Sequence, residues 1–97
     1  MNSLLSKIPV DLKNVSEGDI DKEILRAGII AELDAVNLYE QMAGLTKNAN
    51  IRAILLDIAK EEKTHIGEFQ ALLLQFDPQQ KQELEAGAKE VEEKLSK

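Results

Sequence analysis

Two long runs in the sequence place apolar residues at spacings of three and four, the pattern of an α-helix that buries one side. The first run covers 17–45 and the second covers 50–76, with TKNAN at their junction. The first stripe comprises Leu25, Ile29, Glu32, Val36, Tyr39 and Ala43, and the second comprises Ile51, Leu55, Ile58, Glu62, His65, Phe69, Leu72 and Phe76. No run alternates with a period of two, and aromatic residues make up only 3% of the chain, so strands are not expected. The sequence therefore predicts an all-α fold built on an antiparallel two-helix hairpin.

A short third helix is predicted at the C-terminal end, over 78–95, because Asp77 and Pro78 are typical of a helix start. This segment is highly charged and has Gly87 in its middle, so it can be short, frayed or extended away from the hairpin. Residues 1–15 contain a proline and no clear period, and we interpret them as a flexible arm. We expect a single domain with a small core for 97 residues.

The chain has no cysteine and a formal net charge of −6 at pH 7. Without cysteine there is neither a disulfide framework nor a thiolate metal site, which is compatible with a reducing cytoplasm as the expected location. The acidic balance argues against nucleic acid and an anionic membrane as partners. No run approaches the roughly 18 apolar residues of a membrane span. The apolar part of MNSLLSKIPVDLK is too short for a secretory signal.

Both apolar stripes are interrupted near their centres by groups that can bind metal. Glu62 and His65 are three residues apart, so they leave the same side of one helix, and Glu32 lies at the same level in an antiparallel hairpin. Charged groups within an apolar stripe are costly unless they are paired or bound to a metal. Carboxylate oxygen and imidazole nitrogen suit iron or manganese, and zinc can use the same groups. A Glu on one helix with Glu-x-x-His on another is half of a ferritin-like di-iron site.

One histidine per chain completes only half of such a centre. A second copy related by a two-fold axis would supply two Glu32, two Glu62 and two His65 around two metal ions. The first helix supports this, because its apolar residues extend well beyond the stripe: Ile24, Ala27, Ile30, Ala31, Leu38, Met42 and Leu45. A two-helix hairpin cannot bury all of these alone. We therefore expect a homodimer that completes a ferritin-like four-helix bundle.

The stretches IIAELDAVNLYEQMA and ILLDIAKEEKTHIGEFQALL resemble the encapsulated ferritins, half-length members of the ferritin-like group. The resemblance covers roughly 20–77, with Glu32, Tyr39, Glu62 and His65 in register. It implies a ferroxidase, which oxidises Fe(II) to Fe(III) with oxygen at a di-iron centre between two subunits, with two iron ions per dimer. Glu32 would bridge the ions, and Glu62 and His65 would be terminal or chelating ligands.

The resemblance also implies an assembly. Dimers would form a ring-shaped homodecamer, carried as cargo inside an encapsulin nanocompartment whose shell stores the oxidised iron. In some archaeal relatives the domain is fused to the shell protein, so this chain can belong to something longer.

Two features of the family's pattern are altered in this chain. Some relatives have a second acidic site through which metal enters, with acids one before and two after the bridging Glu and an aromatic residue nearby. Here Ala31 stands at the first position, Asp34 can serve at the second, and Leu38 replaces the aromatic residue. The tail KEVEEKLSK is charged, whereas an encapsulin-targeting peptide would be apolar and glycine-rich.

Other interpretations of these residues stay open. Glu32 and Glu62 can form the solvated edge of an amphipathic helix, and Tyr39 can be a packed core residue or a hydrogen-bond donor to a ligand carboxylate. Glu68, one turn beyond His65, can contact the imidazole. For the whole chain, the alternatives to a ferroxidase are a non-catalytic helical oligomerisation module with a structural metal site and a rubrerythrin-like peroxide reductase.

Overall fold

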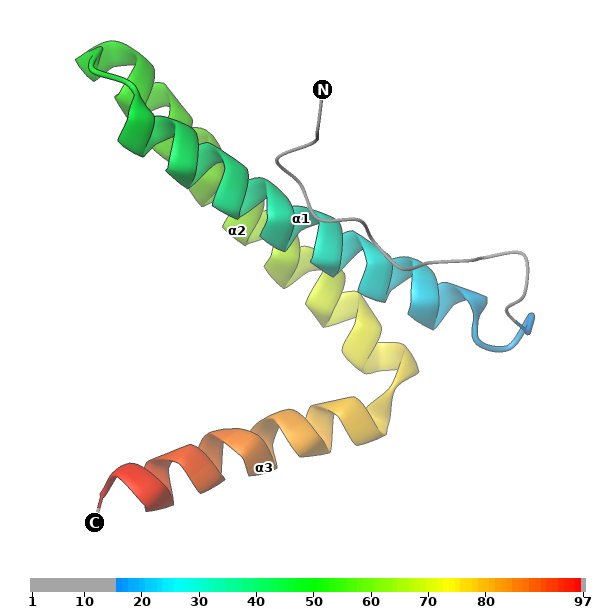
Figure 1. The fold of residues 1–97 in the computed structure, drawn as a ribbon. Coiled ribbons are helices and arrows are strands. Elements are labelled where there is room, and N and C mark those ends of the chain that lie inside the picture. The colour runs from blue at the N-terminus through cyan, green and yellow to red at the C-terminus, as the bar shows by residue number, and fades with distance from the viewer. Residues whose placement is uncertain (1–15, 97) are drawn as a thin grey trace.

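The computed structural model describes residues 16–96, which form three α-helices: α1 (Ile20–Leu45), α2 (Ala49–Phe76) and α3 (Pro78–Leu95). Helices α1 and α2 lie antiparallel and side by side, and α3 turns away from them at the open end of the hairpin (Figure 1). No strand is present in the described part of the chain. The predicted all-α hairpin with a short C-terminal helix is therefore confirmed. The predicted arm, 1–15, lies outside the described residues.

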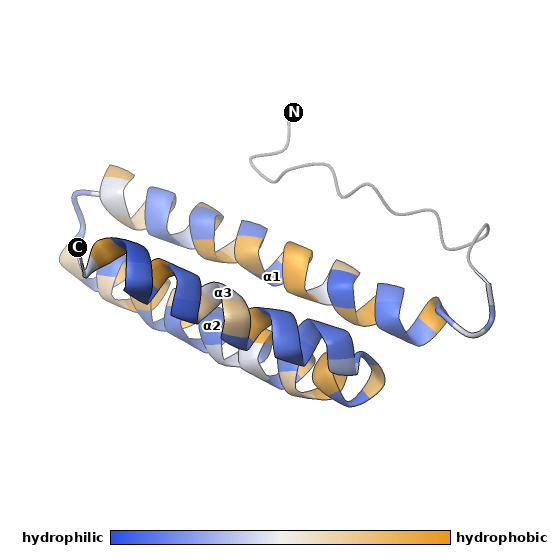
Figure 2. Cartoon of the chain, turned by 90° about the horizontal axis from the view of Figure 1, so that it is seen from below, coloured by the Kyte–Doolittle hydropathy of each residue, from blue (hydrophilic) through white to orange (hydrophobic). Residues whose placement is uncertain are grey.

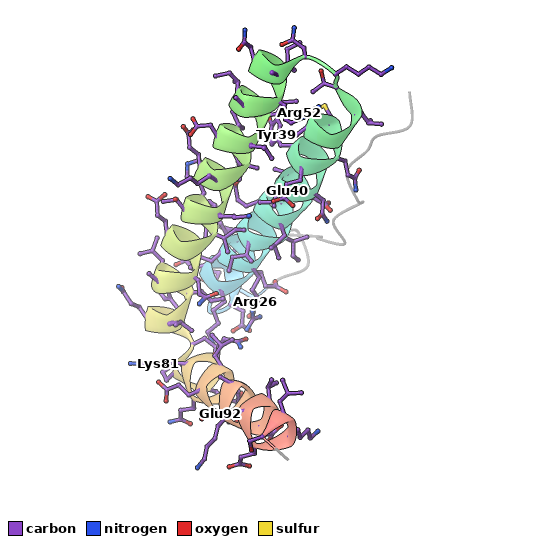
Figure 3. The ribbon with its side chains drawn as sticks, turned by 90° about the vertical axis from the view of Figure 1, so that its left-hand side faces the viewer. Arg26, Tyr39, Glu40, Arg52, Lys81 and Glu92 are labelled. Carbon is purple, nitrogen blue, oxygen red and sulfur yellow. The ribbon has the colours of Figure 1, made fainter. Side chains whose placement is uncertain are left out.

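The connection between α1 and α2 is held by side chains on both sides of it. Asn48 Oδ1 accepts hydrogen bonds from the backbone N–H groups of Asn50 and Ile51 in the first turn of α2, at 2.9 and 3.0 Å. Arg52, near the hairpin tip in Figure 3, donates from Nε to the carbonyl oxygen of Ala43 at 3.1 Å and from Nη2 to that of Thr46 at 2.6 Å. Because these carbonyls end α1, the connection stays short and fixes how the two helices align.

The side of the hairpin where α1 and α2 meet is narrow. Its buried apolar residues are Leu25, Val36 and Ala43 on α1 and Ala59 and Leu73 on α2. Figure 2 shows hydrophobic and hydrophilic positions interspersed along both helices, so apolar residues remain beside those that the hairpin buries. None of the described helices is long and apolar enough to cross a membrane.

The predicted core stripe of α2 is partly wrong. Ile51, Leu72 and Phe76 were expected in the core but are 51%, 47% and 48% exposed. The side of α2 that packs on α1 is instead centred on Ala59 and Leu73, because a helix with apolar residues on two adjacent sides can cover only one of them against a single partner. The second apolar side of α2 therefore lies open.

Helix α1 begins at Ile20, three residues later than expected. Residues 16–19 form a turn, in which the Asp19 N–H donates to the Ser16 carbonyl at 3.0 Å and the Ser16 hydroxyl donates to Asp19 Oδ2 at 3.0 Å. The helix start expected at 17 is therefore wrong, because Ser16 and Asp19 bond each other before the helix begins.

Asp77 determines where α2 ends and α3 begins. Its Oδ1 accepts from the N–H of Gln80 at 3.1 Å, and Pro78 occupies the first turn of α3. Its Oδ2 accepts from the guanidinium of Arg26 on α1 at 2.8 Å. No residue of α3 is buried, and the helix is mostly hydrophilic (Figure 2). The segment is therefore a continuous helix that extends away from the hairpin, and not a short or frayed one.

Candidate metal centre

The antiparallel hairpin brings one residue of α1 and two residues of α2 together near the middle of the helices. Glu32 lies on the side of α1 that faces α2, between Leu25 and Val36, which are both buried. Glu62 and His65 lie one turn apart on α2 and extend toward the same space. The three predicted ligand residues therefore form one cluster.

The ligand atoms of the cluster are close enough to share an ion. Nδ1 of His65 lies 3.6 Å from Oε2 of Glu32 and 3.6 Å from Oε2 of Glu62, and one ligand atom from each of the three residues lies within 4.8 Å of the others. Metal–ligand bonds to nitrogen and oxygen are about 2.0–2.2 Å long, so two atoms that bind one ion can be up to about 4.4 Å apart. The separations of 3.6 Å are longer than a hydrogen bond and suit a bridging ion.

Burial also indicates that these carboxylates need a further partner. The side chains of Glu32 and Glu62 are 21% and 18% exposed. Oε2 of Glu32 is fully buried and accepts no hydrogen bond from any described residue. A buried carboxylate oxygen without a partner is unfavourable by about 1–3 kcal/mol or more. A cation at this position would remove that cost, so the residues present fit a metal ion.

The chemistry of the ligand groups limits which metal ions suit the site. Two carboxylates and one imidazole, with no thiolate, suit iron or manganese, and zinc can accept the same donors. Three donor groups are also too few for a pair of ions, because a ferritin-like di-iron site uses four Glu and two His.

One side of the cluster is open. A surface pocket beside it is lined by Glu32, His65, Glu68, Phe69 and Leu72, and the His65 side chain is 46% exposed. Glu68, which was considered as a contact of the imidazole, thus lies at the same pocket. Among the described residues, Glu68 is therefore the further carboxylate that lines the open side of the cluster.

Two other predicted residues lie outside the cluster. Tyr39 is partly buried and lies seven residues beyond Glu32 on α1, which is about 10 Å along the helix axis. Asp34 follows Glu32 by two residues, or about 200° around the helix, so it leaves a different side of α1. Its Oδ2 is buried and has no hydrogen-bond partner among the described residues. Neither residue joins the three ligand groups in this chain.

Sequence reasoning did not find one close contact beside the site. Gly28, one turn before Glu32, lies directly against the ring of Phe69, which lines the pocket. The available signal was the glycine itself, because a glycine within a helix is unfavourable by about 1 kcal/mol relative to alanine.

Comparisons with known proteins identify the family of the chain. The model of the Rubrerythrin family matches residues 23–96. The chain is 63% identical over 71 residues to a ferritin-like–encapsulin shell fusion protein of Pyrococcus furiosus, covering 73% of this chain and 21% of that protein. It is 41% identical over 70 residues to the encapsulin nanocompartment cargo protein EncC of Myxococcus xanthus, covering 72% of this chain and 51% of that protein. The chain thus spans about a fifth and about half of these two relatives.

A solved structure extends the likeness to the fold. The crystal structure of the encapsulated ferritin domain from Pyrococcus furiosus superposes with a TM-score of 0.79 at 49% sequence identity. The match covers 90% of this chain and 94% of that one. The chain therefore belongs to the rubrerythrin family and, within the ferritin-like proteins, to the encapsulated ferritins.

Proposed function

We propose that this chain is a ferroxidase, which oxidises Fe(II) to Fe(III) with oxygen at a di-iron centre shared between two copies. The observation that carries the proposal is the cluster of Glu32, Glu62 and His65, whose ligand atoms lie within 4.8 Å of one another. Oε2 of Glu32 is buried and accepts no hydrogen bond from the described residues. The ferritin-like family supplies the matching precedent of Glu with Glu-x-x-His at a di-iron site.

A shared centre requires a homodimer, and the open side of the hairpin supports one. Ile51, Ile58 and Leu72 lie at seven-residue intervals from His65, so they share its side of α2. Ile51 and Leu72 are about half exposed, which leaves an apolar surface around the metal cluster. A second hairpin on this surface would cover the apolar residues and supply the other three ligand groups.

Within such a dimer, the residues of the chain bind and orient the ions. Glu32 of each copy would hold both ions, and Glu62 and His65 of each copy would hold one of them. Four carboxylates then carry four negative charges, which balance two Fe(II) ions. The reaction removes one electron from each of two Fe(II) ions and transfers both to dioxygen, which takes up two protons and leaves as hydrogen peroxide.

The relatives suggest where the iron goes. One curated relative is a fusion with an encapsulin shell and another is a cargo protein of an encapsulin nanocompartment. We infer that this domain works inside such a compartment in the cytoplasm, as a ring-shaped homodecamer built from dimers, and that the shell stores the oxidised iron. The encapsulin shell protein is then its partner.

Native mass spectrometry under anaerobic Fe(II) titration, followed by an oxidation assay in air, tests the proposal. We expect dimers with two iron ions, and oxidation faster than in buffer. His65→Ala and Glu62→Ala should each abolish the excess rate, whereas Asp57→Ala, at an exposed acid of α2, should not. A monomer that binds two ions would contradict the shared centre, and ligand variants with the wild-type rate would contradict the residue assignment.

The family match favours a second candidate, because the family model carries the name Rubrerythrin. In a rubrerythrin-like peroxide reductase the same ligands would serve an iron pair that is oxidised by hydrogen peroxide. Comparing the rates of Fe(II) oxidation with equal concentrations of oxygen and peroxide separates the two functions. If metal binds but neither oxidant exceeds the buffer rate, the site is a structural metal site in an oligomerisation module.

A further inference from the structure

Gly28 and Phe69 form a contact between the two helices beside the metal cluster. Gly28 lies one turn before Glu32 on α1, and Phe69 lies one turn after His65 on α2. A Cβ atom added at Gly28 would lie 3.2 Å from Cε2, 3.2 Å from Cζ and 3.3 Å from Cδ1 of the Phe69 ring. Even one methyl group at position 28 would therefore require the ring to move by a few tenths of an ångström.

These distances also give the orientation of the ring. Cδ1 and Cε2 lie across the ring from each other, and both are almost equally far from the Cβ position. The ring therefore lies with its face against the backbone of Gly28. A flat ring in this position takes little space beside α1 and leaves the pocket at Glu32 and His65 open.

We propose that Gly28 is a positioning residue, which holds the Phe69 ring flat against α1 so that the ring forms one wall of the metal site without entering it. The inference rests on the proposed function, since it concerns metal binding by Glu32, Glu62 and His65. A side chain at position 28 pushes the ring away from α1. Because Phe69 lines the same pocket as His65 and Glu32, moving the ring changes the shape of the pocket beside the ligand groups.

The other glycines within the hairpin helices are different. A Cβ atom at Gly44 of α1 or at Gly67 of α2 would meet no other atom within 4 Å, apart from the adjoining backbone. Alanine fits at both positions and is the better helix former. Gly28→Ala and Gly44→Ala are thus matched changes in one helix, of which only the first meets the Phe69 ring.

The test is a titration of the intact chain with Co(II), a divalent probe that does not oxidise in air and whose visible absorption reports its ligand geometry. Gly28→Ala should raise the Kd for Co(II) about tenfold or more and change the absorption spectrum, as is typical when a residue that orients metal ligands is altered. Gly44→Ala should change neither. Circular dichroism of the metal-free variants checks that each is folded.

A double-mutant cycle separates positioning from a general effect on folding or dimerisation. In the Phe69→Leu background the smaller side chain leaves room for a methyl group, so Gly28→Ala should leave the Kd within about twofold of that of Phe69→Leu alone. An equal Kd for Gly28→Ala and wild type would overturn the inference, as would the same tenfold loss in both backgrounds. If wild type binds no Co(II), Fe(II) or Mn(II), the proposed function fails and this inference fails with it.

Discussion

The guanidinium of Arg26 on α1 donates a hydrogen bond to the carboxylate of Asp77 at 2.8 Å, so α1 holds the residue that joins α2 to α3. Asp77 is buried, while Arg26 is about half exposed at the open end of the hairpin (Figure 3). The backbone N–H of Gln80 holds the pKa of Asp77 below its ordinary value, and Arg26 and Lys22 lower this pKa further, whereas burial acts in the opposite direction. One carboxylate therefore caps α3 and also anchors it to the hairpin.

Asp77→Asn should destabilise the protein at neutral pH and leave it less sensitive to acid. Because the folded pKa lies below the unfolded value, the ionised carboxylate stabilises the fold fully above the unfolded pKa, and this stability is lost as the pH falls through the folded pKa. The difference in unfolding free energy between wild type and variant should be constant from pH 7 to about pH 5 and shrink below about pH 4. Urea melts across this range measure it. Asp57→Asn is the control, and a difference that does not change with pH would contradict the role of the Asp77 charge.

Asn48→Ala should lower the stability of the hairpin by about 1 kcal/mol, because it leaves two backbone N–H groups at the start of α2 without their acceptor. Asn50→Ala, two residues later, removes no cap and should cost less than about 0.5 kcal/mol. Urea melts of the metal-free proteins compare the two variants. Equal effects would mean that the cap contributes nothing measurable to the connection.

The hairpin and the level of the cluster could be predicted because both depend on local signals. The polar break TKNAN marks the connection, and two antiparallel helices have the same rise per residue. Counting outward from the connection therefore puts Glu32 beside Glu62 without any knowledge of packing. The late start of α1 was missed because Ser16 and Asp19 also suit a turn, and the turn is what they form.

Which side of α2 is covered could not be predicted from the sequence. Ile51 and Leu72 are as apolar as the buried Leu73. The spacing of apolar residues therefore predicts the helix correctly but does not say which of them meet α1. The contact of Gly28 with Phe69 could not be predicted either, since it depends on the distance between the helices. The rotation and separation of the two helices depend on side-chain packing, and the spacing of apolar residues does not determine them.

Leu72→Asn should weaken the metal-bound dimer at least about tenfold, since both copies would lose apolar area at the interface. Leu72 is 47% exposed and lines the pocket beside the cluster. Leu33→Asn is the matched control, because Leu33 is 51% exposed on α1 but does not line that pocket. Sedimentation equilibrium with Co(II) compares the dimer dissociation constants. If Leu33→Asn is as harmful as Leu72→Asn, the dimer does not form on the side of the metal cluster.

Glu32→Ala should separate function from stability. In the metal-free dimer, the carboxylates of two Glu32 and two Glu62 would meet in a mostly apolar interface, where repulsion and desolvation act against association. Within a single chain, Oε2 of Glu32 is already buried and has no hydrogen-bond partner among the described residues. Replacing Glu32 by alanine removes this charge and leaves a small cavity between Ile29 and Val36, where only a few methylenes are lost.

The relief of repulsion should at least offset the cavity, so the metal-free variant should melt at the wild-type temperature or above it. The same variant should bind no iron pair and lose the oxidation rate in excess of buffer. Glu32→Gln is the control, since it keeps the side-chain volume and removes only the charge, and it should behave like alanine in both assays. Thermal melts in chelator, paired with Fe(II) oxidation in air, measure the two effects. If the metal-free alanine variant loses more than about 2 kcal/mol of unfolding free energy, Glu32 is instead a structural partner of His65. A carboxylate that is only repelled by its neighbours cannot stabilise the fold by that amount.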